Sequence, residues 1–206
     1  GGEIIELDIR DSADGVPFVI HDALLDRTTN GDGPVAETES EVLDTLDAGG
    51  WFGPAYAGER LPRLEHFLEA IREEADFYLE FKQADPVAVG DILTRLDLCD
   101  RVFVYSETVD QRNAIAKALP WIKRMVNWRD IPDCAVARAQ GYKIMEFHAP
   151  DVTPDRLVTA RENSLEIMIY TELDDKAVFQ SAISENVDYM NTDFPAAVKE
   201  LRNQGT

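Results

Sequence analysis

Short apolar runs alternate with helical patterns along the last two thirds of the chain. The runs are rich in β-branched and aromatic residues, and the segments between them have the spacing of amphipathic helices. We expect strands at 77–82, 101–106, 122–127, 143–148, 165–171 and 187–193. We expect helices at 86–96, 109–119, 131–140, 153–163 and 174–184. This regular alternation predicts right-handed crossover units and a parallel sheet.

The first 60 residues follow a different pattern. A strand of the same kind is expected at 3–10, and the apolar run 16–22 follows it after a turn that is too short for a crossover helix. This run should therefore pair antiparallel or form an irregular extension. From 23 to 58 the pattern breaks into Thr, Asn, Gly and Pro around one short helix at 39–46. We interpret 23–58 as a cap inserted over one end of the sheet, because long loops in compact domains are often functional.

The number of strands indicates the fold class. With 3–10 included, the chain has seven strands of the parallel type, one fewer than an eight-stranded barrel. We therefore predict an α/β fold, a TIM-type (β/α)8 barrel whose first strand and helix would precede residue 1. Residues 1–206 are expected to form one domain, since a single hydrophobic core can grow to roughly 250–300 residues.

Charge and composition exclude several classes of protein. The chain has 40 acidic and 20 basic residues, a formal net charge of −20, and no basic stripe, so nucleic acid is excluded as a partner. A small phosphate ester can still bind where a metal ion reverses the local field. Solubility or a salty habitat is the simpler explanation of the acidity itself.

Membrane and redox signals are few. No apolar stretch approaches the roughly 18–20 residues that a membrane-spanning helix needs, so we expect no transmembrane segment. The two cysteines, Cys99 and Cys134, lie far apart and match no metal-ligand spacing. This favours a reduced cytoplasmic protein, with a mature secreted form as the alternative.

Two strands place carboxylates on one face. Glu6 and Asp8 alternate with apolar residues in the first strand, and Glu80 and Lys82 do so in the strand at 77–82. Three carboxylates would then converge beside one lysine, and burying them together is costly unless a cation neutralises them. Oxygen ligands suit one hard divalent ion, Mg²⁺ or Ca²⁺. The alternative is that these are solvated strand ends paired with Arg or Lys.

The histidines differ in their surroundings. His21 ends an apolar run and precedes Asp22, and an imidazole at a strand end can give or take a proton near pH 7. A structural role for His21 is the alternative. His148 ends a predicted strand on the same face as Glu146, so it could face the barrel mouth. His66 falls within a predicted amphipathic helix at 64–71, and we interpret it as non-catalytic.

Several short motifs together resemble a known family. In chain order they are Glu6-Leu7-Asp8, Asp14-Gly15-Val16-Pro17, His21-Asp22, Leu25-Asp26-Arg27-Thr28-Thr29-Asn30-Gly31, Gly50-Trp51-Phe52, Arg60-Leu61-Pro62, Glu80-Phe81-Lys82 and Asn191-Thr192-Asp193-Phe194-Pro195. Their order and spacing resemble those of glycerophosphodiester phosphodiesterases. The resemblance covers essentially the whole chain and is densest from 3 to 82.

The resemblance implies an activity and roles for individual residues. The implied reaction is the hydrolysis of a glycerophosphodiester to glycerol 3-phosphate and an alcohol. Glu6, Asp8 and Glu80 would hold one divalent metal ion. His21 would be one of two catalytic histidines, and Lys82 would help to neutralise the phosphate.

The resemblance also implies a substrate pocket and shows two departures. The insert at 23–58 would cap the pocket, with Trp51 and Phe52 lining it; anchoring of the insert is the alternative role for these two rings. The family opens with a His-Arg-Gly strand and a Pro-Glu-Asn-Thr helix, which we expect upstream of residue 1, together with the partner histidine. A late Trp-Thr pair of the family is Tyr170-Thr171 here, so Tyr170 is expected to line the pocket with an altered substrate fit.

Other functions remain open on the sequence. Phospholipase D-like toxins, which are lipid phosphodiesterases, have a similar site. They are secreted and disulfide-bonded, which the two distant cysteines of this chain do not suggest. A retaining glycosidase normally places its two carboxylates on separate strands rather than at positions i and i+2. A non-catalytic barrel that binds a phosphodiester or a partner protein is the alternative from a different class.

Overall fold

The computed structural model describes residues 3–204. The chain forms two compact units. The N-terminal unit comprises residues 4–122, and the C-terminal unit comprises residues 123–204 together with Glu3. The expectation of one domain over 1–206 stays a prediction.

The sheet of the N-terminal unit contains three parallel strands and one antiparallel strand. Its order is β2 (Pro17–Val19), β1 (Ile4–Asp11), β3 (Asp76–Gln83) and β4 (Val102–Tyr105). β1, β3 and β4 are parallel, whereas β2 pairs antiparallel with β1. The antiparallel alternative for 16–22 is thereby confirmed, because the turn after β1 leaves no room for a crossover helix.

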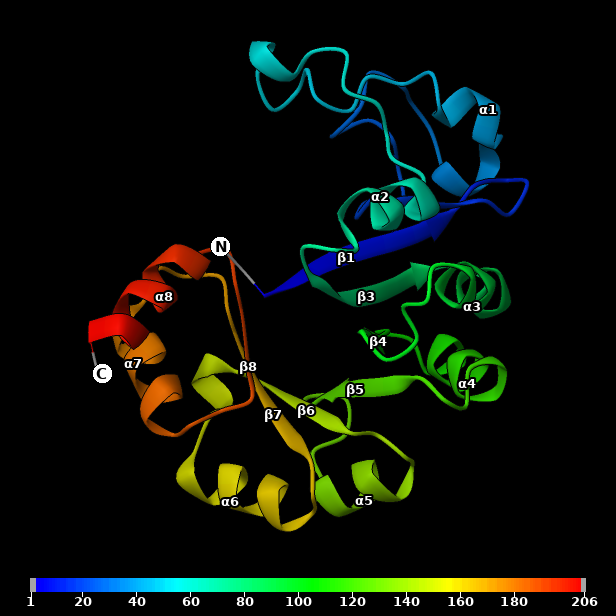
Figure 1. Ribbon diagram of the computed structural model, residues 1–206. Coiled ribbons are helices and arrows are strands. Elements are labelled where there is room, and N and C mark those ends of the chain that lie inside the picture. Colours follow the sequence, from blue (N-terminus) through cyan, green and yellow to red (C-terminus); the bar gives the residue numbers. More distant parts are fainter. Residues whose placement is uncertain (1–2, 205–206) are drawn as a thin grey trace. The chain divides into compact units, whose positions relative to one another are not determined.

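Helices cover one face of this sheet (Figure 1). They are α2 (Leu64–Ile71), α3 (Pro86–Arg95) and α4 (Val109–Ala118). The carboxylate of Asp85 accepts a hydrogen bond from the Val87 N–H and so caps the first turn of α3. Apolar side chains of β1 and β3 form the core under the helices; they include Leu7, Ile9, Phe77, Leu79 and Phe81. The polar residues between them therefore point to the opposite face of the sheet.

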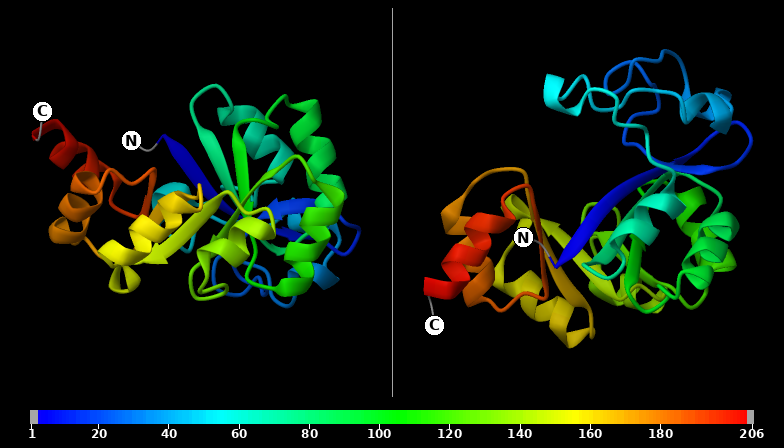
Figure 2. Two further views of the ribbon diagram at one scale, coloured as in Figure 1. Left: turned by 90° about the horizontal axis from the view of Figure 1, so that it is seen from below. Right: turned by 45° about the horizontal axis from the view of Figure 1, so that its top comes forward.

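The segment 23–58 is mostly irregular and has a small core of its own. It contains two 3-10 helices, η1 (Val35–Glu37) and η2 (Pro54–Tyr56), and the short helix α1 (Ser40–Leu43). In Figure 2 it forms the blue-to-cyan group of loops beyond the end of β1. Its apolar residues pack with the end of the neighbouring strand; this cluster is Phe18, Ile20, Leu25, Val35, Leu43, Leu46 and Leu61.

One side chain anchors α1 to the sheet. The carboxylate of Asp14, in the turn after β1, accepts hydrogen bonds from the N–H and the hydroxyl of Ser40 at 2.8 and 2.7 Å. These bonds, with a third from the Ser12 hydroxyl, hold the pKa of Asp14 well below its usual range. The expected helix at 39–46 is shorter in the structure, because turns follow Leu43.

The C-terminal unit repeats the alternation of strand and helix. Its parallel strands are β5 (Lys123–Asn127), β6 (Ile144–His148), β7 (Glu166–Thr171) and β8 (Tyr189–Thr192). Its helices are α5 (Cys134–Ala139), η3 (Ala149–Asp151), α6 (Pro154–Glu162), α7 (Lys176–Ser184) and α8 (Pro195–Gln204). Of these, η3 and α8 were not predicted from the sequence. The predicted α/β class, with parallel strands joined by helices, is confirmed.

Three further expectations concern the chain as a whole. The strand and helix expected before residue 1 lie outside the sequence and stay a prediction. Among residues 3–204 no helix is long and apolar enough to cross a membrane. Cys99 and Cys134 are both free thiols, and the expected compartment stays a prediction.

Candidate active site

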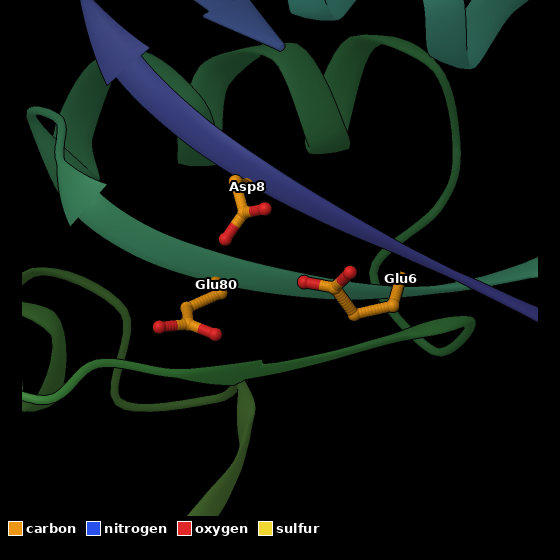
Figure 3. A group of neighbouring side chains, drawn as sticks. All are labelled: Glu6, Asp8 and Glu80. Atoms are coloured by element: carbon orange, nitrogen blue, oxygen red, sulfur yellow. The ribbon is translucent and has the colours of Figure 1, made fainter. Parts of the chain in front are cut away.

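Three carboxylates meet on the open face of the N-terminal sheet. Asp8 lies opposite Glu80 in the parallel register of β1 and β3, and Glu6 precedes Asp8 by one full strand repeat. One oxygen atom from each residue lies within 4.8 Å of the other two. Figure 3 shows the three side chains pointing toward one another from the two strands. The sequence thus correctly anticipated that Glu6, Asp8 and Glu80 converge.

Lys82 neutralises part of this negative charge. Its Nζ contacts the carboxylate of Glu80 and lies 3.4 Å from an oxygen of Asp8 and 3.9 Å from one of Glu107. Burial raises the pKa of Glu80, and the contact with Lys82 only partly offsets this. For Lys82, burial favours the neutral amine, but the bond to Glu80 and the nearby carboxylates outweigh it and raise the pKa. Lys82 is therefore a cation at neutral pH.

The three carboxylates fit a hard divalent ion. Oxygen ligands lie about 2.0–2.6 Å from Mg²⁺ or Ca²⁺, so two ligands of one ion are at most roughly 5 Å apart. The 4.8 Å limit among Glu6, Asp8 and Glu80 satisfies this condition without a change of backbone. All the donors are oxygen atoms, as both ions prefer.

His21 is held by a neighbouring acid and a cation. Its Nδ1 lies 2.7 Å from Oδ1 of Asp22. Arg27 donates to the same carboxylate twice, from Nε to Oδ2 at 2.5 Å and from Nη2 to Oδ1 at 2.8 Å. The bonds from Arg27, followed by the contact with His21, hold the pKa of Asp22 well below its usual range. An ionised carboxylate only accepts, so Nδ1 of His21 carries the proton and Nε2 of the neutral ring is an acceptor.

One cavity joins the histidine to two of the carboxylates. It has a volume of about 290 Å³, and its polar wall includes Glu6, Asp8, His21 and Thr28. Trp51 and several aliphatic side chains complete the lining. A candidate proton-transfer group and candidate metal ligands therefore border the same space, as an acid–base hydrolase requires.

The loop that carries Trp51 is fixed by Asp47. The Asp47 carboxylate accepts hydrogen bonds from the N–H groups of Gly49, Gly50 and Gly58 at 2.9, 2.8 and 2.9 Å. These three bonds lower the pKa of Asp47. Trp51 donates from its indole Nε1 to the Ala48 carbonyl at 2.9 Å. The role of Asp47 was not predicted from the sequence, although an acidic residue shortly before two glycines is a typical turn signal.

Phe52 and Tyr170 are placed differently from the other predicted residues. Phe52 is 68% exposed and packs edge-on against Trp51, with ring centroids 5.8 Å apart. Tyr170 lies on β7 of the C-terminal unit, where its hydroxyl donates to Glu172 at 2.8 Å and its ring meets His148 edge-on at 5.0 Å. Phe52 does not line the cavity described above, and neither does His66 on α2. The expected role of Tyr170 in the pocket stays a prediction.

Comparison with known proteins identifies the family. Residues 1–197 match the model of the glycerophosphoryl diester phosphodiesterase family. A curated glycerophosphodiester phosphodiesterase from Caldanaerobacter subterraneus is 29% identical over 100% of this chain and 88% of its own. The alignment with a Bacillus subtilis relative is 44% identical but covers only 43% of this chain and 36% of that protein.

Solved structures give the same result. A glycerophosphodiester phosphodiesterase from Agrobacterium tumefaciens is 38% identical, with a TM-score of 0.92 over 96% of this chain and 87% of its own. An Oleispira antarctica phosphodiesterase, solved in complex with the product sn-glycerol-3-phosphate, shares the fold with a TM-score of 0.85 at 22% identity, over 98% of this chain and 86% of its own. The resemblance seen in the sequence motifs is confirmed: the chain belongs to the glycerophosphoryl diester phosphodiesterase family.

Proposed function

We propose that the protein hydrolyses glycerophosphodiesters to glycerol 3-phosphate and an alcohol at the cavity beside β1. The observation that carries this proposal is the convergence of Glu6, Asp8 and Glu80 within 4.8 Å, next to a cavity that His21 also lines. Membership of the family supports the reaction class. The product bound to the Oleispira antarctica relative supports glycerol 3-phosphate as the retained half of the substrate.

The three carboxylates would hold one divalent ion, Mg²⁺ or Ca²⁺. When bound, such an ion polarises a phosphate oxygen and offsets its negative charge. Without a counter-charge this acidic wall would repel a phosphodiester, because the substrate is itself an anion. Lys82 supplies a second positive charge, and its contacts with Asp8 and Glu80 hold the ammonium group beside the ligands.

His21 would transfer the proton that hydrolysis requires. Asp22 keeps the proton on Nδ1, so Nε2 can accept a proton from the attacking hydroxyl or return one to the leaving alkoxide. Both directions agree with the geometry. Attack by water and attack by the neighbouring glycerol hydroxyl through a cyclic intermediate also both agree with it.

Aromatic side chains would bound the substrate. Trp51 borders the cavity beside Glu6 and Asp8, and Phe52 packs against the Trp51 ring from outside the lining. In this proposal the segment 23–58 acts as the cap of the pocket. The expectation from the sequence that Tyr170 contacts the substrate stays open; its hydroxyl donates to Glu172.

The test is metal-dependent release of glycerol 3-phosphate from glycerophosphocholine. We expect a chelator to abolish the activity and added Mg²⁺ or Ca²⁺ to restore it. Substitution Asp8→Asn should lower turnover at least about a hundredfold, since a ligand to the ion is lost. Asp76→Asn is the matched control, because Asp76 begins β3 and pairs with Arg101 at 2.7 Å. Full activity of Asp8→Asn in the presence of chelator would refute the proposal.

A further inference from the structure

Arg27 is an exposed residue whose side chain contacts both Asp22 and Trp51. Its side chain is 58% exposed, yet the guanidinium makes two hydrogen bonds to Asp22 and lies 5.9 Å from the centre of the Trp51 ring. An ordinary ion pair at the surface contributes little to stability. A two-bond fork, however, fixes the orientation of a carboxylate, which a single contact cannot do. We therefore expect the Arg27–Asp22 fork to affect the orientation of the Asp22 carboxylate more than the free energy of unfolding.

The orientation of Asp22 decides what His21 can do. Oδ1 of Asp22 accepts from both Arg27 and His21, while Oδ2 accepts from Arg27. His21 and Asp22 are adjacent in the chain, and the Asp22 side chain is 24% exposed. Within residues 3–204, the fork from Arg27 and the bond to His21 are the hydrogen bonds that restrict the rotation of this carboxylate.

The second contact of Arg27 leads to the wall of the cavity. Trp51 borders the cavity, and the Asp47 carboxylate holds the loop on which it lies. A guanidinium near an indole ring is attracted by the negative face of the ring. Trp51, Arg27, Asp22 and His21 thus form one series of contacts from the cavity wall to the imidazole.

We propose that Arg27 is a positioning residue: it aims the Asp22 carboxylate at Nδ1 of His21 and links that carboxylate to the Trp51 ring. The inference rests on the proposed role of His21 in proton transfer. Arg27 is neither a candidate metal ligand nor part of the cavity lining, and it meets that lining through the Trp51 ring. Its effect on the reaction therefore passes through the tautomer and orientation of one ring.

The first test measures the tautomer directly. The sequence has three histidines, so ¹⁵N NMR of the full chain resolves their ring nitrogens, with His66→Gln and His148→Gln used for assignment. We expect the neutral His21 ring to carry its proton on Nδ1. Arg27→Met should give a mixture of the two tautomers. Arg27→Lys keeps the charge without the two-bond fork, and its tautomer ratio should lie between those of the wild type and Arg27→Met. An Arg27→Met spectrum identical to the wild type would overturn the proposal.

The second test separates positioning from stability. We expect Arg27→Met to lower kcat about ten- to a hundredfold with KM changed less than about twofold, as for a small misplacement of a reacting group. Arg27→Lys should recover part of the loss. Arg95→Lys is the matched control, because Arg95 makes a comparable exposed ion pair with Glu65 at 2.8 Å on the helices. A loss of kcat with an unchanged His21 tautomer would overturn the proposal.

The third test concerns Trp51. Trp51→Phe keeps an aromatic face for the guanidinium, whereas Trp51→Leu removes it. We expect Trp51→Leu to move the His21 ring signals toward those of Arg27→Met, and an unchanged spectrum would overturn the link to Trp51. Failure of the proposed function is distinguishable: full activity of His21→Ala would refute proton transfer by His21, while the tautomer measurements would still report on Arg27.

Discussion

Asp8 and Glu80 lie directly opposite each other across the parallel strands β1 and β3, and Lys82 contacts both carboxylates. Two acids in register on adjacent strands repel each other unless a cation lies between or beside them. Lys82 supplies one such charge in the structure. The pair therefore indicates where a divalent ion, as proposed above, would stabilise the fold most.

Glu80→Gln tests this relationship through stability. In the wild type, Ca²⁺ or Mg²⁺ at about a hundred times its dissociation constant should stabilise the fold by about 2.7 kcal/mol. For a chain of this length this corresponds to a rise in Tm of roughly 5–10 °C. Glu80→Gln should lose most of that rise, and Asp76→Asn should keep it. Differential scanning fluorimetry with and without metal measures both, and an undiminished rise in Glu80→Gln would exclude Glu80 as a ligand.

His21→Ala tests the proton-transfer role. We expect kcat for glycerophosphocholine to fall by roughly two to four orders of magnitude, the range typical of a general acid or base. The fold should be unchanged, because the His21 side chain is 61% exposed. His66→Ala on α2 serves as the control for a histidine outside the cavity. A decrease in kcat of less than tenfold would show that His21 has a structural role rather than a role in proton transfer.

Asp11 predicts a pH dependence of stability. Burial raises its pKa to about 6 in the folded protein, from 3.8 as the ordinary value. One oxygen accepts from the Asp85 N–H at 2.6 Å, and the other is buried without a hydrogen-bond partner among residues 3–204. The unfolded chain thus loses this proton at lower pH than the folded one. The contribution of Asp11 to the free energy of unfolding should be fully present below about pH 4 and lost as the pH rises through about 6.

The measurement compares the wild type with Asp11→Asn. Urea denaturation at a series of pH values gives the free energy of unfolding for each protein, and the difference between the two curves removes the other acidic residues. We expect this difference to change between about pH 4 and 6, with the wild type losing stability relative to the variant. A difference that is constant across this range would show that Asp11 has an ordinary pKa.

Two glycines in the Trp51 loop give a paired prediction. A Cβ on Gly49 would lie 2.0 Å from the Tyr56 carbonyl oxygen, whereas one on Gly53 would meet only the Tyr56 ring, at 3.7 Å. Gly49→Ala must therefore shift the loop backbone, at a cost of about 1–3 kcal/mol. We expect it to lower kcat/KM about tenfold through misplacement of Trp51, and Gly53→Ala to change it less than twofold. Steady-state kinetics on glycerophosphocholine measure kcat/KM for both variants. Equal effects of the two substitutions would show that the conformation of this loop does not affect the reaction.

The carboxylate cluster could be predicted because it depends on regular structure. Side chains alternate along a strand, and crossover units make neighbouring strands parallel, so Asp8 and Glu80 had to share a face. The same reasoning located the ends of most strands within one or two residues. It also explains why Lys82, on the same face as Glu80, lies beside the carboxylates.

The contacts of the loops could not be predicted in this way. Arg27 reaches Asp22, and Asp47 reaches Gly58, through chain conformations that have no repeating pattern. The length of α1 depends on the turns after Leu43, and the pairing of Tyr170 with Glu172 depends on rotamers. Such contacts follow from tertiary packing, which a single sequence does not encode as a period.

The small core of residues 18–61 has a consequence for how this protein can change. Phe18, Leu25 and Leu43 pack within that cluster, whereas Leu7, Phe77 and Leu79 under the carboxylates belong to another. Two separate hydrophobic clusters therefore support the two parts of the site. One lies under the segment that bears Arg27 and Trp51, and the other lies under the strands that bear the carboxylates. Under the proposed function, exchange of residues 23–58 between relatives would alter which alcohols the pocket admits and leave the affinity for the ion intact, so selection could act on substrate range and on metal use independently.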